Sequence, residues 1–301
     1  RRVVGPAAYP ALTDSVLQAR TVVREKLSDP ALGELVETFD IETFNTNASV
    51  VENILFGTPV GETFNIDDLG KNPYVVEVLE KSSLTQEFLE IGRSLASIMV
   101  ELFNDLPPGH EFFEQFSFID ADDLPKFQRI LNHVEKLGLD NIDQEDKDLL
   151  NQLPFKLVPA RHRLGLIEDD MRKRILDTRR TFAQSLPEDL RDAVEFFDSD
   201  SYNPASSIQD NILFGKIAYG EAQAASRVGG LITEVIEERN LTDTVARVGF
   251  DYDVGIGGAR LTPSQRQKLV LARSLMKRPD VLILSEATAA LDTAAQESIM
   301  A

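Results

Sequence analysis

The sequence predicts an α/β fold that carries a large, mainly α-helical insertion. A helix-start pattern at residues 261–265 is followed by an apolar run at 281–284, the order of a helix and a strand in an α/β layer. A segment at residues 44–57 recurs at 202–215. Residues 93–195 show helical apolar spacing that prolines interrupt. Together these patterns indicate α/β pieces at both ends of the chain and helices between them.

The composition excludes several classes of site. Among 301 residues there are 50 acidic and 31 basic side chains, a formal net charge of −19. Such an acidic surface repels nucleic acid and anionic lipid, so no nucleic-acid partner is expected. The chain has no cysteine and three histidines that lie far apart. We therefore expect neither a disulfide framework nor a thiolate or histidine-rich metal site.

An acidic run and an apolar stretch in the sequence are each expected to have a structural explanation and not to form a functional site. The acidic run at 140–148 could suggest calcium, but it lacks the glycine and terminal glutamate of an EF-hand loop, so a solvated loop or helix start is preferred. The most apolar stretch, 94–103, is short and contains Glu101, whereas a membrane span needs about 20 apolar residues. Residue 1 is arginine, and we expect the chain to be an internal piece of a longer protein.

The repeat relates two segments at a constant offset of 158 residues. Residues 44–57 read FNTNASVVENILFG and residues 202–215 read YNPASSIQDNILFG. The same frame extends backwards through three pairs of positions, which are Leu32 and Leu190, Val36 and Val194, and Phe39 and Phe197. Two copies are too few for a solenoid, so the repeat indicates a duplicated structural unit.

The segment after residue 261 predicts a capped helix. Thr262 is a good N-cap, Pro263 suits the first helical position, and Gln265 completes a capping box. Pro279 ends the helix. One apolar face is formed by Leu269, Ala272, Leu275 and Met276.

An apolar run follows this helix. Residues 281–284 read VLIL, as expected for a strand buried on both faces of a parallel sheet. Ligands of open α/β sheets gather at the carboxyl ends of such strands. Ser285 and Glu286 are therefore predicted to lie where chemistry occurs.

Residues 261–292 resemble the signature helix, Walker B strand and D-loop of an ATP-binding cassette (ABC) transporter ATPase, especially the exporter type. LTPSQ at 261–265 stands where the family has LSGGQ, and the helix continues with the family's QRQ and LAR. EAT-x-ALD matches from Glu286 to Asp292. The NILFG segment resembles the string that follows the Q-loop in ABC exporters. The resemblance implies a partial P-loop NTPase (ABC cassette) core.

On this resemblance the chain divides into three parts. Residues 1–62 are a cassette-like segment with the first NILFG copy. Residues 63–187 form the mainly helical insertion. Residues 188–301 hold the helical subdomain, signature helix, Walker B and D-loop.

The resemblance also implies the site residues and the cofactors, ATP and Mg²⁺. Glu286 would be the catalytic carboxylate that polarises the attacking water. Ser285 replaces the Walker B aspartate and would be a weak magnesium partner through water. The Q-loop glutamine aligns near Ser199 in the second copy and Ile41 in the first. Nucleotide contacts would come from Thr262, Pro263, Ser264, Gln265, Ser285 and Asp292.

The start of this helix is expected to favour the binding of an anion. Pro263 removes one N–H, but the N–H groups of Ser264 and Gln265 are expected to remain available to an anion.

No GxxxxGK[ST] phosphate loop occurs in the 301 residues, and we expect it upstream of residue 1. The isolated chain should therefore bind ATP poorly and be inactive as an ATPase unless joined to such an element.

The predicted function is part of the nucleotide-binding domain of an ABC transporter, which couples ATP binding and hydrolysis to transport. The expected partners are a transmembrane domain and a second nucleotide-binding domain, at the cytoplasmic face of the membrane. The alternative is a degenerate, non-hydrolysing cassette that acts as a regulatory or scaffold module. A soluble ABC ATPase of translation or DNA repair is disfavoured by the acidic charge and the exporter-type NILFG segment.

Overall fold

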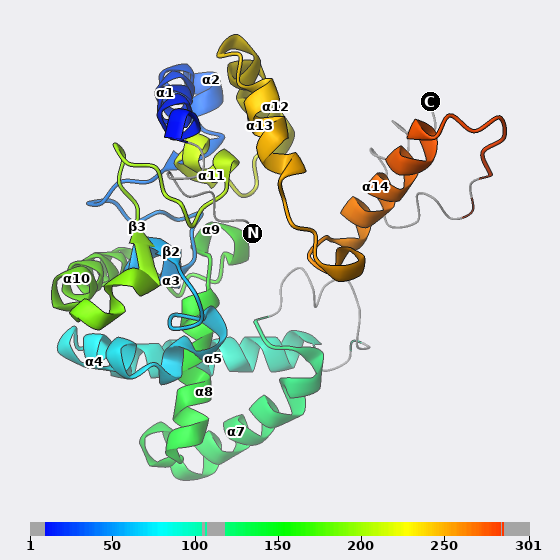
Figure 1. Cartoon of the computed structure of the whole chain (residues 1–301). Helices are drawn as coiled ribbons and strands as arrows, with labels where there is room; N and C mark the ends of the chain where they lie inside the picture. The colour runs from blue at the N-terminus through cyan, green and yellow to red at the C-terminus, as the bar shows by residue number, and fades with distance from the viewer. Residues whose placement is uncertain (1–9, 104–105, 107–117, 284, 286–301) are drawn as a thin grey trace. The chain divides into compact units, whose positions relative to one another are not determined.

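The computed structural model describes residues 10–103, 106, 118–283 and 285. In these ranges the chain is mixed α/β, with many helices and short strands, as Figure 1 shows. The chain forms two compact units, Arg1–Thr242 and Asp243–Ala301. The predicted three-part division, with boundaries at 62/63 and 187/188, stays a prediction.

The first unit contains most of the regular structure. Its strands are β1 (Val36–Thr38), β2 (Gly57–Pro59), β3 (Val194–Phe196) and β4 (Gly215–Ile217). Its α-helices are α1 (Pro10–Lys26), α2 (Pro30–Gly33), α3 (Val50–Leu55), α4 (Pro73–Lys81), α5 (Thr85–Phe103), α7 (Leu124–Leu137), α8 (Gln144–Lys156), α9 (Pro159–His162), α10 (Asp169–Ser185), α11 (Ile208–Leu213) and α12 (Ala224–Glu238). Short 3-10 turns are η1 (Ile66–Lys71), η2 (Ala121–Asp123), η3 (Leu139–Asn141) and η4 (Glu188–Ala193).

Helices α4, α5, α7 and α8 confirm the helical character predicted for the middle of the chain. Helices α5 and α8 cross closely at Gly92, where an added Cβ would stand 2.0 Å from the carbonyl oxygen of Leu150. Phe88 and Phe155 meet edge to face at this crossing, with ring centroids 5.1 Å apart. A hydrophobic cluster of buried residues extends from this bundle to α3, α10 and β3.

The two repeat copies are intertwined. Strand β1 of the first copy pairs with β4 of the second, with Glu37 opposite Lys216. Strand β2 of the first copy pairs with β3 of the second, with Thr58 opposite Glu195. Both pairs are antiparallel. Each ladder therefore joins one copy to the other, and the copies are related by a pseudo-twofold arrangement.

The helices extend this exchange beyond the similarity seen in the sequence. Helix α1 packs on α11 of the second copy, and α10 packs on α3 of the first. The duplicated segment thus comprises a helix, a strand, a turn, a short helix and a second strand. The first helix of each copy, α1 or α10, is called its leading helix, and it packs on the other copy.

Four phenylalanines lie where the copies meet. Phe39 and Phe197 stack with ring centroids 4.3 Å apart and planes 13° apart. Phe56 and Phe214 meet this pair edge to face, at 5.6–6.3 Å. Such aromatic pairs add about 0.5–1.5 kcal/mol each beyond the area that they bury.

The described part of the second unit contains α13 (Thr242–Phe250), which begins at its boundary, a 3-10 turn η5 (Ile256–Gly258) and α14 (Pro263–Met276). Helix α14 confirms the predicted helix and its start.

Candidate functional site

Helix α14 begins with a complete capping box. The Thr262 hydroxyl accepts the N–H of Gln265 at 3.2 Å. In return, the Gln265 side-chain oxygen accepts the N–H of Thr262 at 3.0 Å. Pro263 occupies the first helical position. The local sequence thus fixes where this helix starts without help from other elements.

This cap limits what the helix start can offer to an anion. Since the Gln265 N–H is held by Thr262 and Pro263 has no N–H, the prediction that two N–H groups remain available is wrong. Ser264 keeps the first-turn N–H for which the described part of the chain shows no acceptor. One N–H and the helix dipole are a poor cradle for a triphosphate, which is usually bound by several N–H groups of a glycine-rich loop. The described residues alone therefore do not fit bound ATP.

The predicted Walker B strand is wrong for residues 281–283, which form no strand. Val281 and Ile283 are 76% and 87% exposed rather than buried. A strand needs a neighbour that satisfies its N–H and C=O groups, and the described part of the second unit contains none. Ser285 is exposed. Glu286 and Asp292 lie outside the described residues.

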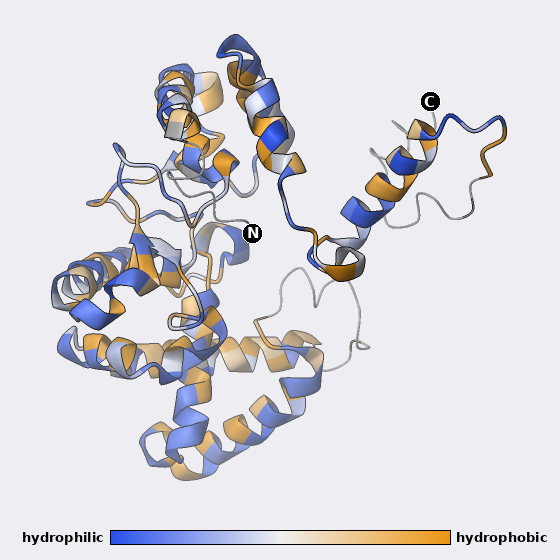
Figure 2. Cartoon of the chain, viewed as in Figure 1, coloured by the Kyte–Doolittle hydropathy of each residue, from blue (hydrophilic) through white to orange (hydrophobic). Residues whose placement is uncertain are grey.

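Several apolar side chains of α14 are exposed. Figure 2 shows hydrophobic residues along this helix, and Leu269, Leu275 and Met276 are 53%, 54% and 83% exposed. Leu271 is the buried residue of α14. A monomer rarely leaves such a set uncovered, so this surface has the character of one that another element covers.

In the first unit, the turn that aligns with the Q-loop in the second copy is held by Arg20. Its guanidinium, on α1, donates to the carbonyl oxygens of Asp198, Ser199 and Ser201 at 2.7–3.0 Å. It also donates to the main chain and side chain of Asn211 at 2.7 and 3.2 Å. Arg20 is 6% exposed, so its side chain is buried, while the turn residues that it holds are exposed.

Arg179, on α10, makes the twin of this network. It donates to the carbonyl oxygens of Asp40, Ile41 and Thr43 at 2.7–3.2 Å. It also donates to the main chain and side chain of Asn53 at 2.7 and 3.1 Å. Ser199 and Ile41, the positions aligned with the Q-loop glutamine, thus use equivalent carbonyl oxygens to hold an arginine.

Burial changes the acid–base character of both arginines. Desolvation lowers the pKa of Arg179 to about 10, against the opposing effect of Asp40. Desolvation likewise lowers the pKa of Arg20, with Asp198 and Asp200 opposing it. Each guanidinium also lies over an aromatic ring, Arg179 at 4.4 Å from Phe56 and Arg20 at 4.5 Å from Phe214. Both groups stay charged at neutral pH.

Paired asparagines complete each turn. The Asn53 side-chain oxygen accepts the N–H of Asn45, and its amide donates to the Asn45 carbonyl, both at 2.8 Å. Asn211 and Asn203 repeat both bonds at the same distances. These side chains are 1–6% exposed. The asparagine of NILFG is therefore a buried structural residue, which explains why it recurs.

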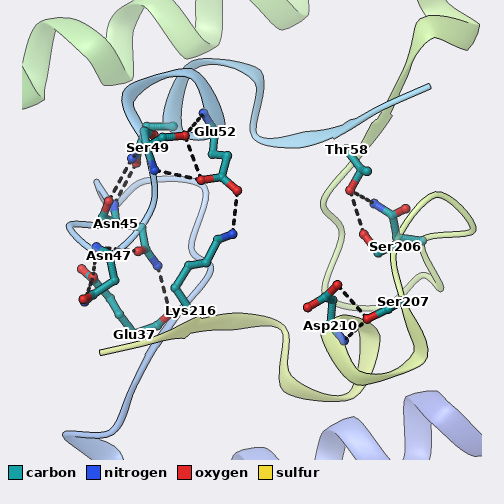
Figure 3. Close-up of polar contacts among 12 residues, drawn as sticks. Glu37, Asn45, Asn47, Ser49, Glu52, Thr58, Ser206, Ser207, Asp210 and Lys216 are labelled. Atoms are coloured by element: carbon teal, nitrogen blue, oxygen red, sulfur yellow. Dashed lines mark hydrogen bonds and ion pairs between the residues drawn. The ribbon is translucent and has the colours of Figure 1, made fainter. Parts of the chain in front are cut away.

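Figure 3 shows where the two copies differ. Lys216 of β4 pairs with Glu52 of α3 at 2.6 Å. The position equivalent to Lys216 is Thr58, whose hydroxyl bonds Ser206 at 2.7 Å instead. Asp210, the equivalent of Glu52, is bonded by Ser207 at its own helix start.

The charged groups around the two ladders differ accordingly. Burial alone would raise the pKa of Glu52, but Lys216 and the hydrogen bonds from Ser49 outweigh it and hold the pKa below its ordinary value. Burial raises the pKa of Glu195.

Two cavities lie beside these networks in the first unit. The smaller, of about 120 Å³, is lined by the Glu52 and Lys216 pair and by Thr58, Ser206 and Asp210. The larger, of about 580 Å³, lies between α1 and the turns around Asp40 and Ser199. No group of three or more histidine and acidic side chains in the described residues is placed to hold a metal ion.

The two arginines are the site residues that sequence reasoning missed. The detected similarity stops at Leu32 and Leu190, short of α1 and α10. Arg20 lies 33 residues before Asn53, and Arg179 lies 32 residues before Asn211. This one-residue shift breaks the constant offset. An arginine sought at about the same distance before each NILFG copy would have indicated the pair.

Comparison with known proteins defines the class: the chain is similar to exporter-type ABC transporters, as its signature region and NILFG segments predicted. It is 40% identical over 95 residues to an ATP-dependent lipid A-core flippase of Xylella fastidiosa, covering 31% of this chain and 15% of that protein. It is 35% identical over 112 residues to the heterocyst differentiation ATP-binding protein HepA of Nostoc, covering 36% and 17%.

A longer match is to an ATM1-type heavy metal exporter of Novosphingobium aromaticivorans, 26% identical over 213 residues, or 62% of this chain and 34% of that protein. The chain thus spans about a third or less of these relatives. No family model matches the chain. No solved structure matches it. Among the described residues no helix is long and apolar enough to cross a membrane.

Proposed function

We propose that this chain is part of the nucleotide-binding domain of an exporter-type ABC transporter and couples ATP binding and hydrolysis to transport. The observation that carries the proposal is the similarity to ABC exporters, combined with a capped α14 at the position of the signature helix. The proposed partners are a transmembrane domain and a second nucleotide-binding domain. The chain would act at the cytoplasmic face of the membrane.

In this proposal ATP and Mg²⁺ bind at a site to which this chain gives one part. The Ser264 N–H and the α14 dipole would face the terminal phosphate, next to the Thr262 cap. Ser285 and Asp292 would lie nearby. Glu286 would accept the proton of the attacking water. The phosphate loop would come from a different segment or chain.

A second candidate is a degenerate cassette that regulates or scaffolds without hydrolysis. Three observations favour it. Ser285 stands where the family has a magnesium-holding aspartate, and the Gln265 N–H is already used by Thr262. The second NILFG copy is also engaged in ladders with the first copy.

The substitution Glu286→Gln, made in the protein that contains the phosphate loop, distinguishes the two. For the coupled ATPase we expect Mg-dependent hydrolysis to fall by at least about 100-fold, as for loss of a positioned general base, while nucleotide binding persists. The matched control is Glu297→Gln, a carboxylate of the same unit for which no role is proposed. A wild-type protein that binds nucleotide without turnover supports the degenerate cassette. Turnover that survives Glu286→Gln contradicts the catalytic role.

A further inference from the structure

The two repeat copies are each incomplete. The described strands β1 and β2 find their ladder partners only in β4 and β3. The turn of each copy is held by an arginine from the leading helix of the other, and both arginines are almost fully buried. Separated from each other, the copies would expose these arginines, the phenylalanine cluster and two pairs of strand edges. Neither copy can therefore keep this structure alone.

The contact between the copies is also self-complementary. Arg20 and Arg179 make the same five kinds of hydrogen bond, to three turn carbonyls and to both oxygens of an asparagine. This is the property of an isologous interface, in which the same patch serves both partners. The first half of another chain can therefore make the same contacts with the second half as the first half of the same chain does.

A short connection separates the exchangeable parts. Residues 163–168 join α9 to α10. Every inter-copy contact described above joins the body before this connection to the body after it, residues 169–242. Arg163 has a φ of 51° and Gly165 a φ of 69°. A non-glycine residue in the left-handed region is strained, and short strained hinges favour exchange of the part that follows them.

We propose that two copies of this chain assemble by exchanging residues 169–242, so that each pair of ladders is built from two chains. In the exchanged dimer Arg20 of one chain holds the turn around Ser199 of the other, and β1 pairs with the partner's β4. All inter-copy contacts are kept. The difference from the closed monomer is the extended connection at 163–168, which releases the left-handed conformation of Arg163 and moves Ile167, 5% exposed in the closed monomer.

The experiment uses the absence of native cysteine. Val36 and Ile217 face each other in the β1–β4 ladder. One full-length chain carries Val36→Cys and a second carries Ile217→Cys. The two are mixed, unfolded together in urea, refolded at high concentration and oxidised mildly. In an exchanged dimer of the two variants, position 36 of one chain faces position 217 of the other, so the two introduced thiols meet.

We expect a covalent dimer in the mixture, in about half of the exchanged dimers if chains combine at random. Each variant refolded alone should give little, because neither contains both halves of the pair. The double variant Val36→Cys and Ile217→Cys, refolded when dilute, must form an internal disulfide, which shows that the pair can close. In the mixture, Arg163→Asn in both chains should lower the yield of covalent dimer, since asparagine tolerates the left-handed conformation.

The proposal is overturned if the double variant closes internally but the mixture gives no more covalent dimer than the single variants. A dimer that appears equally in all samples would also overturn it, because such cross-linking does not depend on the β1–β4 register.

Discussion

Replacing Arg179 with alanine tests whether the intertwined repeat is held together by its buried arginines. The variant removes the five hydrogen bonds to the turn at 40–43 and to Asn53. It also removes the guanidinium from the face of Phe56, 4.4 Å from the ring centroid.

The size of the effect follows from which acceptors water can reach. The turn residues Asp40, Ile41 and Thr43 are exposed, so water can replace part of their bonds. Asn53 is 1% exposed. Its side-chain oxygen keeps the N–H of Asn45, whereas its main-chain oxygen would lose the Arg179 donor. A buried acceptor left without a donor costs about 1–3 kcal/mol, the aromatic contact adds about 1–2 kcal/mol, and the weakened bonds of the turn add to these. We expect a total loss of about 3–5 kcal/mol, in line with disruption of buried charged networks.

Urea unfolding followed by circular dichroism measures this loss. Because a domain is stable by only about 5–15 kcal/mol, the midpoint should fall steeply. The twin Arg20→Ala should show a loss of similar size, since it removes the same bonds in the other copy. Arg180→Ala is the control, because its ion pairs with Glu42 and Asp177 are exposed, and its midpoint should match the wild type. If Arg179→Ala unfolds at the wild-type midpoint, the arginines do not hold the copies together.

Two further outcomes are expected. Lys216→Met removes the partner that lowers the pKa of Glu52, so the stability difference from wild type should be largest near pH 7 and shrink as the pH falls through the lowered folded-state pKa of Glu52. This contribution is present above the unfolded-state pKa and lost as the pH falls through the lower folded-state value. A difference in urea midpoint that stays constant as the pH is lowered from 7 through the whole acid range would contradict the assignment. Gly92→Ala should destabilise by about 1–3 kcal/mol in thermal unfolding, because its Cβ meets Leu150 on α8. Gly229→Ala, in α12, should instead stabilise the protein by about 0.5–1 kcal/mol, because no heavy atom lies within 4 Å of the added Cβ. A loss of stability there as large as at Gly92 would show that backbone freedom, and not the close helix crossing, causes the effect.

The sequence patterns predicted those features of the fold that interactions between nearby residues determine. The start of α14 could be predicted because Thr262, Pro263 and Gln265 act within one turn. The duplicated unit could be predicted from NILFG because Asn53 and Asn211 are held by bonds within and near each copy. The similarity to ABC exporters followed from ordered motifs, which the comparisons support.

Long-range pairing could not be predicted from the same patterns. The strands β1 to β4 have three residues each, too short to show a period of two. Nothing local to Arg20 indicates that its partners lie about 180–190 residues further along. The apolar run at 281–283 looked like a buried strand, but a strand forms only where another strand accepts its hydrogen bonds.

Lys216 lies in the β1–β4 ladder, and its counterpart Thr58 lies in the β2–β3 ladder. This chemical difference between the two ladders bears on how the chain can change over evolutionary time. In a homodimer, one substitution appears on both sides of the axis at once, so any change must be tolerated twice. Here both halves belong to one polypeptide, and each position occurs once. One side can therefore keep a charged pair between Lys216 and Glu52 while the other becomes a hydroxyl pair between Thr58 and Ser206. Fusion of the halves lets a symmetric scaffold acquire two chemically different edges without loss of the buried arginines that both edges share.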